Sequence, residues 1–402
     1  MVEWLKSVDC SIEEFKKTDD FKSFIPMTSD ANDNEIMNAT AGVYFQWLDM
    51  QSKTRNGSIT KHEESCDLIY IPPDNNSTED EEDGRGMGIL FPSDNGEHID
   101  SWLNWFRSDE CNHKMAISCW AADKNNYNLA KKLYARGFSS GFISNWLVLD
   151  MNHTSLDCSH FRFLDGVQFR ILRKEEDENV WKNCEEGHPC YKDSIKKTKQ
   201  MHDASRLSSG KLVMFAAFIE DEPIASATLY LGQGENYGVA GLYEVEVVRK
   251  YRGKGIGKAI SYATCHYSKE LGYRYVLGNA SDEGVPMYYK LGFRDFGRGL
   301  VYFIPKSFLS NPVTEKEIEF IEAIGDNNVS TLEKLVKEFK TKKLSNGFTP
   351  IQIAMKLSLP DVASWLHSHG CILDIFSAWE LGWGEELQLL VMKYYFYKIY
   401  SY

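Results

Sequence analysis

The sequence lacks the features that would place this chain outside the cell, in a membrane or on nucleic acid. Its nine cysteines are odd in number and have no disulfide-like spacing, which is typical of free thiols in a reducing, cytoplasmic compartment. No run reaches the ~20 apolar residues needed to span a bilayer, and the first residues lack the basic region and apolar core of a signal peptide. A net charge of −13 argues against nonspecific binding to nucleic acid or anionic membranes, and fits a cationic substrate.

Metal ligands are also sparse. Cys184, His188 and Cys190 lie close together in the sequence and could bind zinc, but a fourth ligand is not evident. We therefore expect an ordinary loop at this place and no metal site.

The chain is long enough for several domains. At 402 residues it exceeds one ordinary core, and its 43% hydrophobic and 26% charged content is that of a soluble globular protein. The patterns described below divide it into three segments, residues 1–155, 160–308 and 315–402.

The most informative segment is a glycine-alternating turn at residues 249–259. It follows a strand-like run (242–248) and opens a helix-like run (259–271). A strand that turns through glycines into a helix directs several backbone N–H groups and the positive helix end to one point, which suits a phosphate. The residues that permit close approach or add positive charge are Gly253, Gly255, Gly257, Arg252, Lys254 and Lys258. We expect a Cβ atom at Gly255 or Gly257 to intrude on the phosphate; a purely structural corner is the alternative.

A second motif follows about thirty residues later. The two motifs are Arg252-x-x-Gly255-x-Gly257 and Met287-Tyr288-x-x-x-Gly292-Phe293. Together they resemble the GNAT (Gcn5-related N-acetyltransferase) superfamily, whose pyrophosphate loop for acetyl-CoA matches the first motif. The resemblance covers about residues 160–308. It implies an α/β (α+β) GNAT fold, and the strand, helix and antiparallel-meander pattern of this segment has the matching order.

The resemblance implies an acetyl-CoA-dependent N-acetyltransferase that moves the acetyl group directly to a primary amine of a protein or small-molecule acceptor. It assigns acetyl-CoA binding to Val247, Arg252, Gly253, Lys254, Gly255, Ile256, Gly257, Lys258 and Ser281. It assigns the general acid that protonates the departing thiolate to Tyr288. A core aromatic is the alternative role for Tyr288, and Tyr289 is the alternative register.

The general base is less clear from the sequence. Many GNAT members carry a glutamate early on the strand before the loop, where this chain has Gly241. Glu244 is the candidate we favour and Glu246 is the second, since alternation places both on one face of the strand. A chain of water molecules without a single base is equally compatible. We expect Cys265 and the neighbouring histidine to serve packing and not to form a nucleophile pair.

The first segment, residues 1–155, contains a partial copy of the same pattern. Residues 128–138 resemble the second motif, with Tyr134 at the tyrosine position, and residues 146–150 resemble a closing strand. No glycine-rich cationic turn precedes them, and the acidic run at 80–83 would repel a pyrophosphate. We therefore expect a degenerate GNAT-like domain without a cofactor loop, in which Tyr134 serves packing. A helical domain with a chance match is the alternative.

The third segment, residues 315–402, resembles ankyrin repeats. Residues 346–354 are similar to the "G-x-TPLH-x-A" signature, with Gln352 in place of histidine. The resemblance implies an all-α solenoid in which Thr349 caps a helix and Pro350 occupies its first turn. Three units barely fit, so we expect docking against the middle domain to complete the core.

Two functions from different classes remain open. The first is the N-acetyltransferase, with an acceptor cleft shaped by the first segment, residues 174–199 and the repeats. The second is an acyl-CoA-binding module with little or no turnover, in which ankyrin-like repeats bind a protein partner; this architecture also resembles bacterial effectors delivered into host cells. Release of CoA in the presence of varied amines would separate the two.

Overall fold

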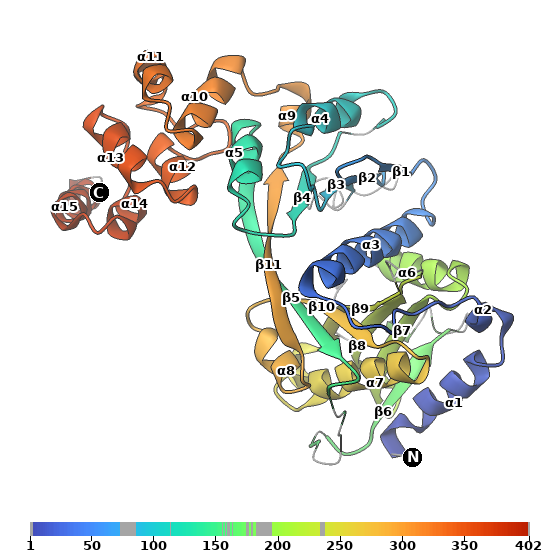
Figure 1. The fold of residues 1–402 in the computed structure, drawn as a ribbon. Helices are drawn as coiled ribbons and strands as arrows, with labels where there is room; N and C mark the ends of the chain where they lie inside the picture. Colours follow the sequence, from blue (N-terminus) through green and yellow to red (C-terminus); the bar gives the residue numbers. More distant parts are fainter. Residues whose placement is uncertain are drawn as a thin grey trace.

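The structure is a computed structural model (Figure 1). It describes the chain apart from residues 1–2, 73–85, 113, 155, 157, 159–160, 163, 174–176, 178–179, 182–194, 234–237 and 401–402; at 195–198 and 393–400 it describes the backbone alone. The acidic run at 80–83 and the cluster Cys184, His188 and Cys190 lie outside the described residues. Within the described part, no three metal-binding side chains come together and no helix is long and apolar enough to cross a membrane.

One mixed sheet of eleven strands runs through the described part of the molecule (Figure 1). Its strand order is β1-β2-β3-β4-β11-β5-β10-β9-β8-β7-β6. The strands are β1 (Ile59–His62), β2 (Asp67–Tyr70), β3 (Met87–Leu90), β4 (Ile117–Ala121), β5 (Ser139–Asp150), β6 (Val167–Leu172), β7 (Leu212–Ile219), β8 (Glu222–Leu231), β9 (Ala240–Val247), β10 (Tyr275–Ala280) and β11 (Arg294–Ile304).

Helices cover the sheet and form the C-terminal part of the chain. The helices before the last strand are η1 (Glu3–Leu5), α1 (Lys6–Phe15), α2 (Asp19–Lys22), α3 (Asp33–Ser52), α4 (Ile99–Arg107), α5 (Tyr127–Ala135), α6 (Ile195–Leu207), η4 (Arg249–Tyr251), α7 (Ile256–Glu270) and α8 (Val285–Tyr289). Those after it are α9 (Ser307–Ser310), α10 (Glu315–Gly325), α11 (Val329–Phe339), α12 (Pro350–Lys356), α13 (Pro360–Ser368), α14 (Ile375–Glu380) and α15 (Gly384–Tyr400).

The sheet consists of two similar halves. In the first half, β3 passes through α4 to its parallel neighbour β4, and α5 and β5 follow. In the second half, β9 passes through α7 to its parallel neighbour β10, and α8 and β11 follow. Among the described strands these are the two parallel pairs, so each half contains one parallel crossover of the same kind.

The two halves exchange their closing strands at the centre of the sheet. β5 of the first half pairs antiparallel with β10 of the second half, and β11 of the second half pairs antiparallel with β4 of the first. β5 and β11 also pair with each other. Because the hydrogen bonds of these three ladders all join one half to the other, the two halves form a single continuous sheet.

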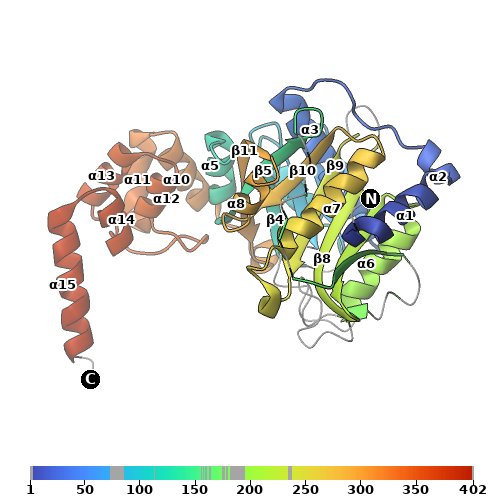
Figure 2. The same cartoon turned by 90° about the horizontal axis from the view of Figure 1, so that it is seen from below.

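Amphipathic helices fill both faces of the second half. On one face, α7 buries Ile256, Ala259, Ile260, Ala263 and Tyr267, whose three- and four-residue spacing forms one apolar stripe. α1 packs beside it, against α7 and β6, so the start of the chain lies on the second half (Figure 2). α3 and α6 cover the opposite face (Figures 1 and 2).

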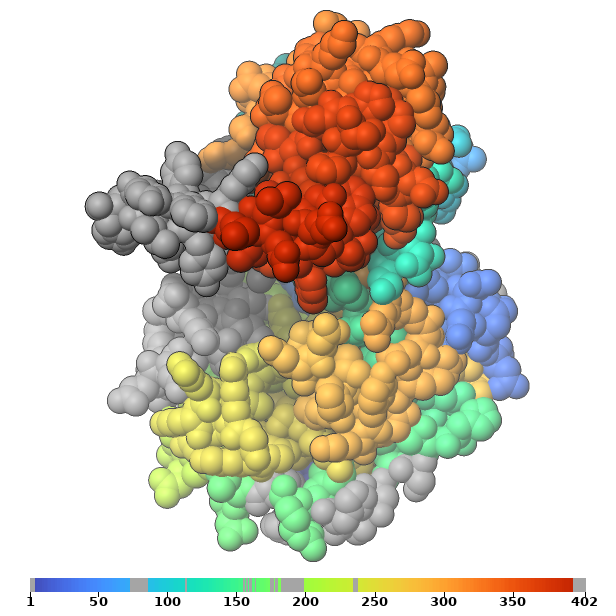
Figure 3. Space-filling view, turned by 90° about the vertical axis from the view of Figure 1, so that its left-hand side faces the viewer, coloured from blue at the N-terminus to red at the C-terminus, as the bar shows by residue number. Residues whose placement is uncertain are grey.

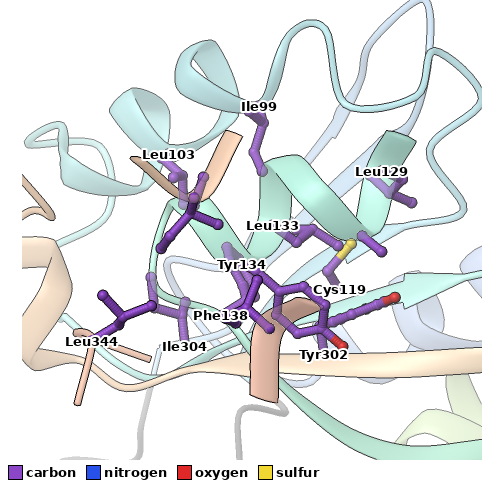
Figure 4. Close-up of a cluster of buried hydrophobic side chains, with 14 of the residues drawn as sticks. Ile99, Leu103, Cys119, Leu129, Leu133, Tyr134, Phe138, Tyr302, Ile304 and Leu344 are labelled. Atoms are coloured by element: carbon purple, nitrogen blue, oxygen red, sulfur yellow. The ribbon is translucent and has the colours of Figure 1, made fainter. Parts of the chain in front are cut away.

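The C-terminal helices pack against the first half of the sheet. α10 contacts α5, and Asn346 Nδ2 donates a hydrogen bond to the Tyr134 backbone oxygen at 3.0 Å. Arg136 forms ion pairs with Glu322 and with Asp100. Figure 4 shows Leu344 beside Ile304 of β11, in one apolar cluster that also contains Tyr134 of α5. The expectation of docking against the middle segment is therefore met in part: β11 of that segment contributes Tyr302 and Ile304 to the cluster, and α5 of the first segment adds apolar and charged side chains.

The C-terminal helices contact one another in succession. α10 contacts α11, α12 contacts α13, and α14 contacts α15, while α12 also contacts α10 and α14. Thr349 caps α12 by accepting the Gln352 N–H at 3.2 Å, and Pro350 is the first residue of the helix. α15 extends away from the rest of the molecule (Figure 2).

Candidate active site

The turn between β9 and α7 has the backbone shape that its glycines allow. Gly253 and Gly255 have φ angles of +73° and +81°, in the left-handed region that glycine adopts without strain. Gly255 is the N-cap of α7, and no side chain in the described part of the chain caps this helix. The first N–H groups of α7 therefore remain available to an external acceptor such as a phosphate oxygen.

Gly257 has a different role from the one expected. It lies inside α7, and a Cβ atom there would come within 3.2 Å of Met287 Sδ and 3.5 Å of Val247 Cγ2. The absent side chain lets α8 and the end of β9 pack closely against the start of α7. The prediction that a Cβ at this position would meet the pyrophosphate stays a prediction, and the close packing against Met287 is a second reason for glycine here. For Gly255 the constraint is the positive φ angle.

Three cationic side chains surround the turn. Arg252 Nε donates a hydrogen bond to the Val247 backbone oxygen at 2.9 Å, and its guanidinium also pairs with Glu246. Lys258 Nζ lies 4.1 Å from the centre of the Phe161 ring. Lys254 is exposed. The turn thus combines unpaired helix N–H groups with positive charge.

Tyr288 lies on α8, inside the core beside the turn. Its side chain is 6% exposed and packs edge-on against Phe293, with ring centres 5.2 Å apart. Burial raises the pKa of its hydroxyl above the ordinary value, and a contact with Ser261 offsets the rise only in part. A hydroxyl with a raised pKa keeps its proton at neutral pH, as a general acid must.

Tyr289 points elsewhere. Its ring is 46% exposed, and its hydroxyl donates a hydrogen bond to Asp295 on β11. The two adjacent tyrosines of the motif therefore occupy different environments, and Tyr288 is the one that belongs to the core against which Met287 and Val247 also pack.

β9 and β10 separate next to the turn. Their parallel ladder joins residues 240–242 to residues 276–278 and ends there. Beyond it, β9 continues to Val247, whereas the last residues of β10 keep only their pairing with β5 on the opposite edge. Backbone groups of residues 243–247 on the β10 side are therefore not used by this ladder.

Glu244 lies in a bulge of β9. The register changes from Thr228 opposite Tyr243 to Ser226 opposite Glu246, which leaves one extra residue on β9. Glu244 itself has a φ angle of +53°, which is uncommon for a residue with a side chain. Its half-buried carboxylate accepts a hydrogen bond from Thr228 Oγ1 at 3.0 Å. The bulge therefore places this carboxylate in the part of β9 that has separated from β10.

Glu246 and Gly241 are the two other positions of β9 considered for a general base. Glu246 is paired with Arg252, so its charge is already balanced. Gly241 cannot carry a side chain in this conformation, because a Cβ atom would lie 2.5 Å from the Tyr243 hydroxyl. The Tyr243 ring is held there by stacking on Trp47, with ring centres 4.3 Å apart. The Tyr243 ring therefore occupies the space that a glutamate side chain at position 241 would need.

Cys265 and His266 lie on α7 in packed surroundings. Cys265 is fully buried, and burial raises the pKa of its thiol to about 12. His266 Nε2 lies 2.8 Å from Asp9 Oδ1 of α1. A thiol that stays protonated is a poor nucleophile.

Ser281 lies at the end of β10, beside a pocket of about 450 Å³. The pocket is formed by residues 279–283 of the second half and by Phe142 and Ile143 of β5 from the first half. Sequence reasoning missed the two β5 residues. No local signal could reveal them, because they reach the site through the strand exchange.

The first half has a different structure at the matching position between β3 and α4. There the Asp94 carboxylate accepts hydrogen bonds from the N–H groups of Gly96 and His98, at 2.9 and 3.2 Å. The His98 ring also contacts this carboxylate, at 2.5 Å. Tyr134, on α5, is buried against Tyr302 and Phe348. An internal carboxylate thus lies in the loop just before α4, whose N-cap residue is His98 and which, like α7, has no side-chain cap.

Comparison with known proteins agrees with this geometry. The model of the acetyltransferase (GNAT) family matches residues 174–293, which supports placing this part of the chain in the GNAT superfamily. A search of curated proteins found no match.

Several solved structures are similar. A GCN5-related N-acetyltransferase from Kribbella flavida is 14% identical, with a TM-score of 0.47 over 69% of this chain and 98% of that one. A tandem GNAT protein from the clavulanic acid biosynthesis pathway is 11% identical, with a TM-score of 0.46 over 75% of this chain and 95% of that one. An acetyltransferase from Trypanosoma brucei is 25% identical, with a TM-score of 0.26 over 32% of this chain and 92% of that one.

Proposed function

We propose that this chain is an acetyl-CoA-dependent N-acetyltransferase that transfers the acetyl group directly to a primary amine. The observation that carries the proposal is the uncapped start of α7, with its two left-handed glycines and flanking cations, within the residues that match the GNAT family. The segments would divide the work: residues 160–308 bind acetyl-CoA, residues 1–155 form a degenerate copy, and residues 315–402 form ankyrin-like repeats.

The cofactor-binding residues would act through backbone and charge. The N–H groups of residues 252–258 would bind the pyrophosphate, with Arg252, Lys254 and Lys258 adding positive charge. The diverging part of β9, ending at Val247, would offer backbone groups to the pantetheine arm and the thioester carbonyl. Ser281 would border the cofactor at the end of β10.

The reaction requires two proton movements. The amine, once it has lost a proton to a base, attacks the acetyl carbonyl; a C–N bond forms and the C–S bond breaks. Tyr288 would donate its proton to the departing thiolate. Glu244, alone or through water, would accept the proton from the ammonium ion. Proximity of the two reactants supplies much of the rate, because the thioester is already activated.

The decisive test is CoA release by the purified full chain, measured against a panel of amines, peptides and proteins with acetyl-CoA. We expect acceptor-dependent CoA release and an acetylated amine detected by mass spectrometry. Absence of acetyl-CoA binding in calorimetry would overturn the proposal.

A second candidate is an acyl-CoA-binding module with little or no turnover. It is favoured by the Glu246–Arg252 pair and by the Tyr243 ring over Gly241, because both remove a candidate base. In this case the C-terminal helices would bind a protein partner. Tight acetyl-CoA binding without turnover on any acceptor would favour the module.

A further inference from the structure

The pocket at the end of β10 has two walls of different character. β5 contributes the apolar wall with Phe142 and Ile143, which are 48% and 39% exposed. The segment 279–283 contributes the polar wall, which ends in Asp282 and Glu283. Figure 3 shows the surface hollowed between the C-terminal helices (red and orange) and the second half (yellow), with teal-green atoms between them.

The apolar wall is fixed in place although it is exposed. The Phe142 ring packs edge-on against Trp120, with ring centres 5.6 Å apart, and lies 6.1 Å from the ring centre of Phe303. Two neighbouring strands therefore support it, β4 from one half and β11 from the other. The Phe142 ring is therefore packed against other rings on one side and exposed to solvent on the other. Exposed apolar surface of this kind commonly marks a binding site.

The polar wall carries unbalanced negative charge. Within the described part of the chain, neither Asp282 nor Glu283 forms an ion pair, and both are exposed. Asp282 is nevertheless held in position, because Asn145 Nδ2 donates a hydrogen bond to its Oδ1 at 2.8 Å. Asn145 is 1% exposed and also donates to the Ala280 backbone oxygen at 3.0 Å. A buried amide of the first half thus positions a carboxylate of the second.

The pocket adjoins the proposed reaction centre. Ser281 belongs to both, and α8, which carries Tyr288, begins at Val285, just after Glu283. The C-terminal helices also reach the same strand, since Lys356 Nζ donates a hydrogen bond to Ser140 Oγ at 3.0 Å. The pocket is therefore placed where a second substrate could approach the end of the cofactor site.

We propose that this pocket binds the acceptor as an ammonium ion with an apolar flank. The proposal rests on the proposed acetyltransferase function and names the class of its acceptor. The Asp282 and Glu283 carboxylates would attract the ammonium group, and the Phe142 ring would contact the adjoining hydrocarbon and the cation. The strand exchange then has a functional consequence: the half without a cofactor loop supplies the wall that selects the acceptor.

The test compares two probes that differ in charge. Phenethylamine and the uncharged 2-phenylethanol are titrated calorimetrically into the full chain, with and without saturating CoA. We expect the amine to bind about tenfold more tightly than the alcohol. Asp282→Asn keeps the hydrogen bond from Asn145 but removes the charge, so it should abolish most of this difference and leave the alcohol unchanged. Phe142→Leu should weaken both probes about threefold.

The control is Asp221→Asn, which removes an exposed carboxylate in the turn between β7 and β8, outside the pocket. It should leave both probes unchanged. Equal binding of amine and alcohol to the unmodified chain, or an unchanged preference in Asp282→Asn, would overturn the pocket proposal. CoA affinity measured on the same proteins separates the two proposals: normal CoA binding without an amine preference refutes the pocket alone, and absent CoA binding refutes the acetyltransferase.

Discussion

The two strand-to-helix turns of this molecule occupy matching places and have opposite chemistry. Between β9 and α7, two glycines with positive φ angles lead into a helix whose first N–H groups have no side-chain cap. Between β3 and α4, Asp94 accepts the N–H groups of Gly96 and His98. Neither helix has a side-chain cap, but cationic side chains surround the first turn, whereas the second contains a carboxylate that accepts backbone N–H groups.

The parallel strands beside the two turns differ in the same sense. All residues of β3 pair with β4. The ladder between β9 and β10 ends at Leu242, while β9 continues to Val247. Next to its turn, the second half therefore has a strand segment that pairs with β8 on one side and has no ladder on the β10 side, and the first half has no such segment.

The strongest test of the difference between the two halves uses their two matching tyrosines. Tyr288→Phe removes one hydroxyl from the core beside the open turn, and we expect kcat to fall by about 10²–10⁴-fold with acetyl-CoA affinity retained. Tyr134→Phe is the matched control in the first half and should leave kcat unchanged. Steady-state kinetics with an acceptor found by the panel would measure both.

Near-normal kcat for Tyr288→Phe across the pH range would show that Tyr288 is a core aromatic and not the acid. If Tyr289→Phe lost activity instead, the assignment would move by one residue, despite the hydrogen bond that Tyr289 makes to Asp295.

The second prediction concerns a variant that places a carboxylate in the turn between β9 and α7, as in the matching turn of the first half. Lys254→Asp puts a carboxylate just before the start of α7 and removes a cation, without a buried contact to lose, because Lys254 is exposed. Acetyl-CoA affinity should fall roughly 100-fold, as attraction to the phosphates becomes repulsion. Stability should stay equal or rise by about 0.3–1 kcal/mol, because negative charge is favourable at a helix N-terminus.

Calorimetry and denaturant unfolding would measure the two effects of Lys254→Asp, with Lys343→Asp in the exposed loop between α11 and α12 as the charge-matched control. Unchanged affinity in Lys254→Asp would separate the turn from the cofactor.

Local features of this molecule could be predicted from the sequence, and long-range ones could not. The turn with Gly253 and Gly255 and the α8 motif follow from nearby residues, and the GNAT family match covers both. The exchange of β5 and β11 depends on pairing between residues more than a hundred positions apart, which leaves no local pattern. The pocket wall at Phe142 was therefore not predictable.

Two other features depend in the same way on contacts between distant parts of the chain. Gly257 is expected to leave room for a ligand, and the structure adds that Met287 on another helix packs closely against the same position. The C-terminal helices were expected to dock on the middle segment, and α5 of the first segment shares this surface with β11. In both cases the sequence identified an important position, and only the tertiary contact identified its partner.

The third prediction concerns the closed turn. Asp94→Ala leaves the N–H groups of Gly96 and His98 without their acceptor, so the free energy of unfolding should fall by about 1 kcal/mol. It should not create a second cofactor site, because residues 91–98 contain no lysine or arginine. We expect one acetyl-CoA per chain before and after the substitution. A stoichiometry near two in either protein would contradict the difference between the halves.

The smallest expected effect is the pH dependence of the closed turn. Partial burial raises the pKa of Asp94, but the hydrogen bonds from His98 and Gly96 outweigh it and lower the pKa overall; the hydrogen bond to Asp94 raises the pKa of the exposed His98. The stability from Asp94 is present above its unfolded pKa and is lost as pH falls through the lowered folded value. The stability from His98 is present below its unfolded pKa and is lost as pH rises through the raised folded value. The pair should therefore contribute fully only between about pH 4 and pH 6.5.

His98→Gln removes the titrating ring and tests this window. We expect the Tm difference between the unmodified chain and the variant to be largest between about pH 4 and pH 6.5 and to shrink on both sides. Acetyl-CoA affinity should not follow this profile, because Asp94 and His98 belong to the other turn. A Tm difference that stays constant from acid to alkaline pH would show that the His98–Asp94 contact is not an ion pair, and the closed turn would then depend on the Asp94 hydrogen bonds to the backbone alone.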